Sequence, residues 1–138
     1  MNGYRITDHT ADLGVVLTAR DGPALYALAA QALFEQLAAP ETLAARERRA
    51  ITVEGGDPTD LMVNWLRELL YLWHGHQLLV ARVEIEALNA TRLQATLDCD
   101  RFDPRRHEIR TEIKAVTYHR ARVEKGPEGW RGEVVFDV

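Results

Sequence analysis

The sequence contains a single cysteine, Cys99, among its 138 residues. One thiol cannot form an internal disulfide or a cysteine-rich zinc site, and this cysteine usage is typical of a reducing compartment. The chain also lacks a long apolar run, because its longest stretch without formal charge, 69–81, has only 13 residues and includes two histidines. Such a stretch is too short and too polar to span a bilayer. No apolar leader precedes residue 8, so we predict a cytoplasmic protein without a membrane partner.

A surplus of basic residues is missing as well. The chain has 17 Lys and Arg against 21 Asp and Glu, a formal net charge of −4. Nucleic-acid-binding domains commonly show the opposite balance, so direct contact with RNA is not indicated. The composition that is present, 46% apolar and 28% charged, is that of a globular protein, and no linker or repeat divides it. We therefore predict one domain over residues 1–138.

Two amphipathic helices are predicted. Apolar residues recur at three- and four-residue steps over 24–37, with Asp21 as the N-cap. A wider apolar stripe covers 58–73, where Asp57 can cap the first turn. The second helix is expected to end at Gly75, since glycine favours the left-handed conformation that terminates helices.

The rest of the chain is predicted to be largely β-structure. Tight turns at 89–90 and 126–129 favour two antiparallel hairpins. Two helices among several strands joined by short turns indicate an α+β fold, with both helices packed on a largely antiparallel or mixed β-sheet. The strand candidates are 13–18, 50–54, 82–87, 93–99, 108–118 and 133–136.

Three segments carry residue types that can do chemistry. The first is Asp8-His9-Thr10-Ala11-Asp12, which can supply hard oxygen ligands, a general base or only turn hydrogen bonds. The second is the end of the sequence, Phe136-Asp137-Val138, which gathers oxygen donors, although terminal residues often fray. The third is 114–119, where Lys114 could receive a phosphate or be an exposed edge charge.

Two other acidic or histidine-containing patterns do not fit metal sites. Asp98, Asp100 and Asp103 resemble the start of a calcium loop, but a phenylalanine occupies a required oxygen position and no glycine follows. His74 and His76 have metal-like spacing, yet their place at the end of a helix explains them with fewer assumptions.

Four segments together resemble the archease family in their order, their spacing and the total length of the chain. They are 8–12, 65–71, 112–119 and 136–138. The resemblance spans essentially the whole chain. Its least typical part is 98–104, which lacks a glycine expected near Cys99 or Asp100.

The resemblance implies an accessory protein, not an enzyme, that helps an RtcB-type RNA ligase to become guanylylated with GTP and to turn over repeatedly in tRNA splicing and RNA repair. RNA would be met only through the ligase. The resemblance also implies an α+β fold and a bound divalent metal ion, Ca²⁺ first, with Mg²⁺ or Mn²⁺ as alternatives. By resemblance, the metal ligands are Asp12, Asp137 and Val138. The residues expected on the partner-facing surface are Asp8, His9, Lys114 and His119.

Two further classes of function stay open. One is a metal-dependent hydrolase, with Asp12 and Asp137 on the metal and His9 or His119 as the base. Against it, the sequence offers no second set of metal ligands and no obvious substrate-binding loop. The other is a general chaperone or an RNA-binding module, which the negative net charge disfavours for RNA.

Overall fold

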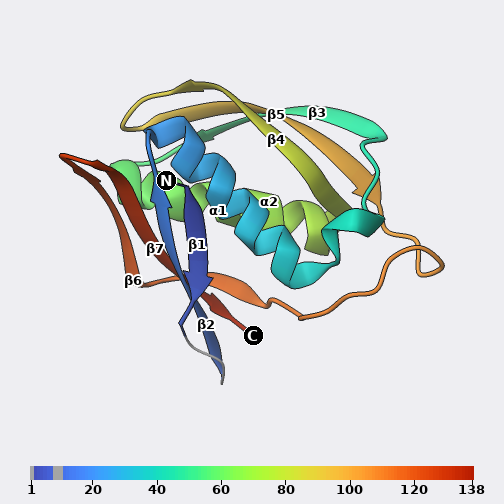
Figure 1. Cartoon of the computed structure of the whole chain (residues 1–138). Coiled ribbons are helices and arrows are strands. Elements are labelled where there is room, and N and C mark those ends of the chain that lie inside the picture. The colour runs from blue at the N-terminus through green and yellow to red at the C-terminus, as the bar shows by residue number, and fades with distance from the viewer. Residues whose placement is uncertain (1, 8–10) are drawn as a thin grey trace.

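The computed structural model describes residues 2–7 and 11–138, which form two antiparallel sheets and two α-helices (Figure 1). The four-stranded sheet has the order β1-β2-β7-β6 and the three-stranded sheet the order β3-β5-β4. The helices lie side by side between the two sheets (Figure 1), so the α+β prediction is confirmed, with two sheets where one was expected. In chain order the elements are β1 (Gly3–Ile6), β2 (Asp12–Ala19), α1 (Gly22–Leu37), the short 3₁₀ helix η1 (Pro40–Thr42), β3 (Glu47–Glu54), α2 (Pro58–His76), β4 (Leu78–Leu88), β5 (Arg92–Arg101), β6 (Ala115–Gly126) and β7 (Gly129–Asp137).

Both helices begin where the capping residues predict. The Asp21 carboxylate accepts a hydrogen bond from the Ala24 N–H at 2.8 Å. At the start of α2, the Asp57 carboxylate accepts one from the Asp60 N–H, also at 2.8 Å. The prediction that α2 ends at Gly75 is wrong, because the helix continues through His76 and Gln77 takes the left-handed conformation, with φ 55°. Gly75 has another role: a Cβ atom there would lie only 2.9 Å from the ring of Tyr71.

The predicted strand 108–118 is also wrong in its bounds. Strand β6 begins only at Ala115, and residues 108–114 form a connection that is tied to the end of α1 by the Arg110 N–H, which donates to the Leu37 carbonyl at 2.7 Å. The side chains of Ile113 and Val116 are both buried, although they lie three residues apart. A regular strand would place such residues on opposite faces, so the chain must twist out of strand geometry here.

The core is one hydrophobic cluster to which both helices and both sheets contribute. Trp65 lies at its centre with 0% exposure, and its indole N–H donates to the Tyr26 carbonyl at 2.9 Å. The turns predicted at 89–90 and 126–129 do close the β4–β5 and β6–β7 hairpins. In the part of the chain that the structure describes, neither helix is long and apolar enough to cross a membrane.

Candidate functional site

Two aspartates from opposite ends of the sequence meet on the four-stranded sheet. Asp12 is the first residue of β2 and Asp137 the last of β7, and these strands are antiparallel neighbours at the centre of the sheet. Their register pairs Asp12 directly with Asp137. Side chains of directly opposed residues lie on one face with Cβ atoms about 4.5–5.5 Å apart. The sheet therefore brings the two carboxylates together.

The backbone around this pair is held by hydrogen bonds on both sides. The Val138 N–H donates to the Ala11 carbonyl at 3.1 Å, which extends the β2–β7 ladder to the last residue of the sequence. On the other side, the Lys114 N–H donates to the Asp137 carbonyl at 2.7 Å. Phe136, next to Asp137, is fully buried and anchors this end of β7 in the core. The position of Asp137 is therefore fixed by the fold.

The charges of the two aspartates are not compensated by other described side chains. In residues 2–7 and 11–138, neither the Asp12 nor the Asp137 carboxylate forms an ion pair or a side-chain hydrogen bond. Like charges placed directly opposite each other in a sheet are destabilising, so a bound cation would relieve an existing cost. We call Asp12 and Asp137 the carboxylate pair.

The chemistry of the carboxylate pair fits a hard divalent cation. Carboxylate oxygens are the donors that Ca²⁺, Mg²⁺ and Mn²⁺ prefer, and no thiolate lies in the pair. Within the described residues, no group of three or more His, Cys, Asp or Glu side chains comes together in a geometry that could hold a metal. The pair would therefore need further oxygens, for which an oxygen of Val138, water or a partner group is available.

The remaining site residues proposed from the sequence are separated by the structure. Lys114 is exposed and lies beside Asp137 through its backbone. His119 is also exposed, but it lies in an irregularity of β6 between Thr117 and Arg122. It follows Ala115, the residue paired with Asp137, by four positions and lies beyond the point where the regular β6–β7 pairing stops. Of the described candidates, only Lys114 contacts a residue of the carboxylate pair, through its backbone, and Asp8 and His9 lie outside the described residues.

The irregular part of β6 contacts α2 through an aromatic and a charged group. Tyr118 is 49% exposed, and its hydroxyl donates to the Asp60 carboxylate. The Arg67 guanidinium lies over the same ring, 4.7 Å from its centroid. The hydrogen bond to Asp60 raises the pKa of Tyr118, and the same bond, together with the Gly56 N–H, lowers the pKa of Asp60. Sequence reasoning singled out the motif 65–71 but not these contacts.

The acidic loop that the sequence excluded as a calcium site is neutralised within the protein. Asp98 pairs with two arginines, and the buried Asp100 accepts two hydrogen bonds from Arg106, at 2.9 and 3.0 Å. His107, whose side chain is fully buried, bonds Asp100 through Nε2 at 2.9 Å, while its Nδ1 accepts the Asp103 N–H. Mainly because of Arg106, the pKa of Asp100 is well below its usual value. This network fixes the loop.

The two histidines at the end of α2 face different groups. His74 Nε2 lies 2.9 Å from the Ile113 carbonyl oxygen. The ring of His76 instead meets the Tyr71 ring edge-on, with centroids 5.4 Å apart. The two histidines therefore do not form a metal-binding pair. This agrees with the interpretation of the sequence, which explained them by their place at the end of a helix.

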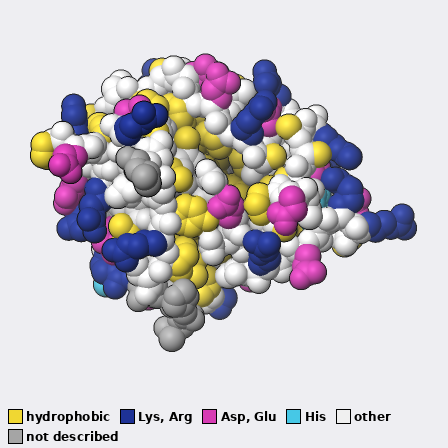
Figure 2. All heavy atoms as spheres, viewed as in Figure 1, with side chains coloured by type: hydrophobic (Ala, Val, Ile, Leu, Met, Phe, Trp, Pro, Cys, Tyr) yellow, Lys and Arg dark blue, Asp and Glu magenta, His cyan; other side chains and the backbone are white. Residues whose placement is uncertain are grey.

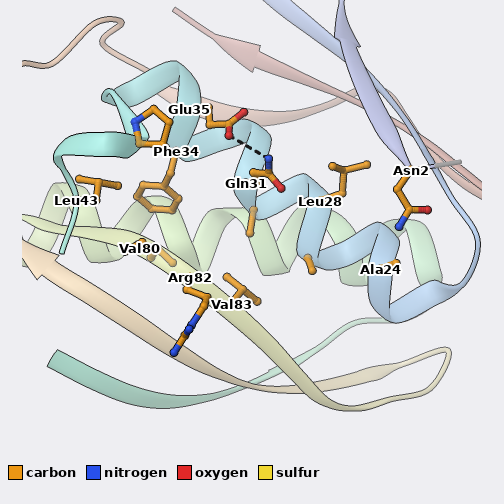
Figure 3. A pocket seen from close by; sticks show the side chains of 14 residues that line it. Asn2, Ala24, Leu28, Gln31, Phe34, Glu35, Leu43, Val80, Arg82 and Val83 are labelled. Atoms are coloured by element: carbon orange, nitrogen blue, oxygen red, sulfur yellow. Dashed lines mark hydrogen bonds between the residues drawn. The ribbon is translucent and has the colours of Figure 1, made fainter. Parts of the chain in front are cut away.

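A separate groove of about 520 Å³ lies between α1 and β4 (Figure 3). Hydrophobic side chains gather in the middle of the face seen in Figure 2, with charged groups around them. At the rim, the Gln31 amide donates to Glu35 at 3.0 Å (Figure 3). The Tyr4 hydroxyl donates to the same carboxylate. The groove brings no set of metal-ligating or nucleophilic side chains together, so the carboxylate pair remains the candidate site.

Comparison with known proteins gives consistent similarities. The model of the archease protein family (MTH1598/TM1083) matches residues 4–138. The archease of Pyrococcus abyssi is 35% identical over the full length of both chains, and that of Methanosarcina mazei is 29% identical over 98% of this chain and 95% of its own. The solution structure of Methanobacterium thermoautotrophicum protein 1598 superposes with a TM-score of 0.82 at 25% identity, covering 99% of each chain. A Thermotoga maritima archease, described as a possible chaperone, shares the fold with a TM-score of 0.63 at 21% identity, covering 96% of this chain and 94% of its own.

Proposed function

This chain belongs to the archease family, and we propose that it is an accessory protein that activates an RtcB-type RNA ligase in the cytoplasm. In this proposal it promotes guanylylation of the ligase with GTP and repeated turnover in tRNA splicing and RNA repair. The observation that supports it most directly is the direct pairing of Asp12 with Asp137, beside Lys114, at one end of the central strands.

In this proposal the carboxylate pair holds one divalent cation, Ca²⁺ first and Mg²⁺ or Mn²⁺ as alternatives, with an oxygen of Val138 as a further ligand. When bound, the cation would supply positive charge to the phosphate groups that a nucleotide-loading ligase must gather. Lys114 adds a second positive charge on the neighbouring strand connection. Exposure of Asp12 and Lys114 suits a group that is presented to a partner. RNA is met through the ligase.

The position of His119 weighs against a metal-dependent hydrolase that uses this histidine as its base. A hydrolytic site needs a general base within hydrogen-bond reach of a metal-bound water. His119 lies four positions beyond the residue paired with Asp137, where the regular β6–β7 pairing is interrupted. The other candidate base, His9, lies outside the described residues. The accessory role asks only that the protein position a cation and an ammonium group.

The proposal is tested with a purified RtcB-type ligase, labelled GTP and a cleaved RNA with ends suited to ligation. Wild-type protein should increase both the rate of ligase guanylylation and the number of ligations per ligase. Asp137→Asn should lose this effect, whereas Glu128→Gln, which removes an exposed carboxylate in the β6–β7 turn, should keep it. Equal ligation with and without the protein would overturn the proposal.

The same experiment separates the alternatives. GTP or RNA hydrolysis by the protein alone would support a hydrolase. Suppression of aggregation of an unrelated, heat-unfolded client, without any effect on ligation, would support a general chaperone.

A further inference from the structure

Two exposed residues of α2 donate hydrogen bonds to the backbone of the segment that contains Lys114. Arg67 Nε donates to the Val116 carbonyl at 3.0 Å. His74 Nε2 lies 2.9 Å from the Ile113 carbonyl oxygen. Because a carbonyl oxygen only accepts hydrogen bonds, Nε2 of His74 must carry a hydrogen. Lys114 lies between the two carbonyls that these side chains hold.

The spacing of the two contacts along α2 matches helix geometry. Arg67 and His74 are seven residues apart, which places them on one face of α2 about 10.5 Å apart along its axis. Ile113 precedes β6 and Val116 lies near its start, and the chain between them departs from strand geometry. Both side chains therefore reach this segment from the same face of α2.

These contacts act where the sheet itself gives no support. Strand β6 is an edge of the four-stranded sheet, so only β7 pairs with it. Backbone groups on its free side need partners from elsewhere or from water. On the side that faces β7, the Lys114 N–H donates to the Asp137 carbonyl. This is the last contact between the two chain segments before residues 108–114 leave the sheet. Arg67 and His74 thus contact the segment 113–116 from α2, while the Lys114 N–H contacts the backbone of Asp137 in the carboxylate pair.

Arg67 is itself fixed before any partner binds. Its guanidinium lies over the Tyr118 ring, and the Tyr118 hydroxyl is bonded to Asp60 on the first turn of α2. An arginine that is already ordered loses less conformational entropy when it holds another group in place. The contact to Val116 is therefore part of a connected set of interactions between α2 and β6.

We propose that Arg67 and His74 are positioning residues, which fix the backbone around Lys114 and so place Lys114 beside the carboxylate pair. They do not touch the cation or the partner's nucleotide. The consequence for ligase activation rests on the proposed function, whereas the effect on the backbone of Lys114 does not.

Backbone hydrogen exchange, followed by NMR on the free protein, tests the structural part. In His74→Leu and in Arg67→Leu, the Lys114 amide should exchange roughly 3- to 10-fold faster, as expected for the loss of one hydrogen bond that supports it. His74→Gln keeps a side-chain N–H donor and should restore slow exchange. His76→Leu is the matched control, because the His76 ring contacts Tyr71 and not this segment. Unchanged exchange of the Lys114 amide in both leucine variants would overturn the proposal.

A double-mutant cycle tests whether the positioning matters for activation. If His74 acts through Lys114, Lys114→Ala should reduce ligase guanylylation several-fold less in the His74→Leu background than in wild type. Lys125→Ala, at the only other lysine, should be additive with His74→Leu. Additive effects of His74→Leu and Lys114→Ala, despite faster exchange, would also overturn the proposal.

The two hypotheses fail in different ways. A wild-type protein that activates no RtcB-type ligase would contradict the proposed function alone, and amide exchange would then decide whether Arg67 and His74 position Lys114.

Discussion

Asp12 and Asp137 are direct cross-strand partners, although they lie 125 positions apart in the sequence. We predict that Asp12→Asn and Asp137→Asn each weaken divalent-cation binding by about 10-fold or more, because each removes one anionic ligand from a hard-donor site. Both variants should keep the fold, and without metal their melting temperatures should equal or exceed that of wild type, since opposed like charges are relieved.

Calorimetric titration with Ca²⁺ and Mn²⁺ measures this effect, with Glu128→Gln as the control for removal of an exposed carboxylate. Wild-type affinity in both asparagine variants would place the cation elsewhere.

Two tryptophans of α2 should differ in their contribution to stability. Trp65 is fully buried and donates its indole N–H to Tyr26, so Trp65→Ala should lower the free energy of unfolding by about 3–5 kcal/mol through the cavity it leaves. Trp73 is only partly buried and meets Phe102 edge-on at 5.4 Å, so Trp73→Ala should cost clearly less. Urea unfolding measures both. Equal midpoints would mean that Trp65 is not the centre of the core.

The buried Asp100 should make stability depend on acid pH. Its folded-state pKa is well below the unfolded value of about 3.9, so its contribution is fully present above about pH 4 and is lost as the pH falls toward the folded-state pKa. Asp100→Asn should cost about 3 kcal/mol at pH 7, the lower end for breaking a buried ion pair, because Arg106 is 31% exposed and can reach water.

Urea unfolding at several pH values checks this prediction. The difference between wild type and Asp100→Asn should narrow as the pH falls below 4, and Asp103→Asn, whose side chain is 42% exposed, should show little effect at pH 7. A difference that stays constant from pH 7 to pH 2.5 would contradict the assigned role of Asp100.

The sequence predicted those features that depend on neighbouring residues. Caps at Asp21 and Asp57 mark helix starts because they bond backbone groups three residues away, and turns at 89–90 and 126–129 join strands that are adjacent in the chain. It did not predict the end of α2, because the left-handed residue is Gln77 and the glycine two positions earlier accommodates a tyrosine ring.

Features that depend on distant segments could not be read from local patterns. The alternation around Ile113 suggested a strand, but the burial of both Ile113 and Val116 and the contacts from α2 override it. The pairing of Asp12 with Asp137 came only from the family resemblance, since no local pattern tells which strands become neighbours. Arg67 fits an exposed helix position, and only the structure reveals that it bonds the β6 backbone.

Lys114 and His119 should differ in their effect on ligase activation, since only Lys114 lies beside the carboxylate pair. Lys114→Ala should lower the rate of ligase guanylylation by about 10-fold or more, because it removes a cation from the place where a triphosphate would be gathered. His119→Ala should lower it less. Lys114→Arg should recover only part of the activity, because a planar guanidinium does not replace a compact ammonium charge. Circular dichroism first confirms that each variant is folded, and labelled GTP then measures guanylylation of the ligase. Full activity of Lys114→Ala would remove this residue from the mechanism and leave the carboxylate pair as the working group.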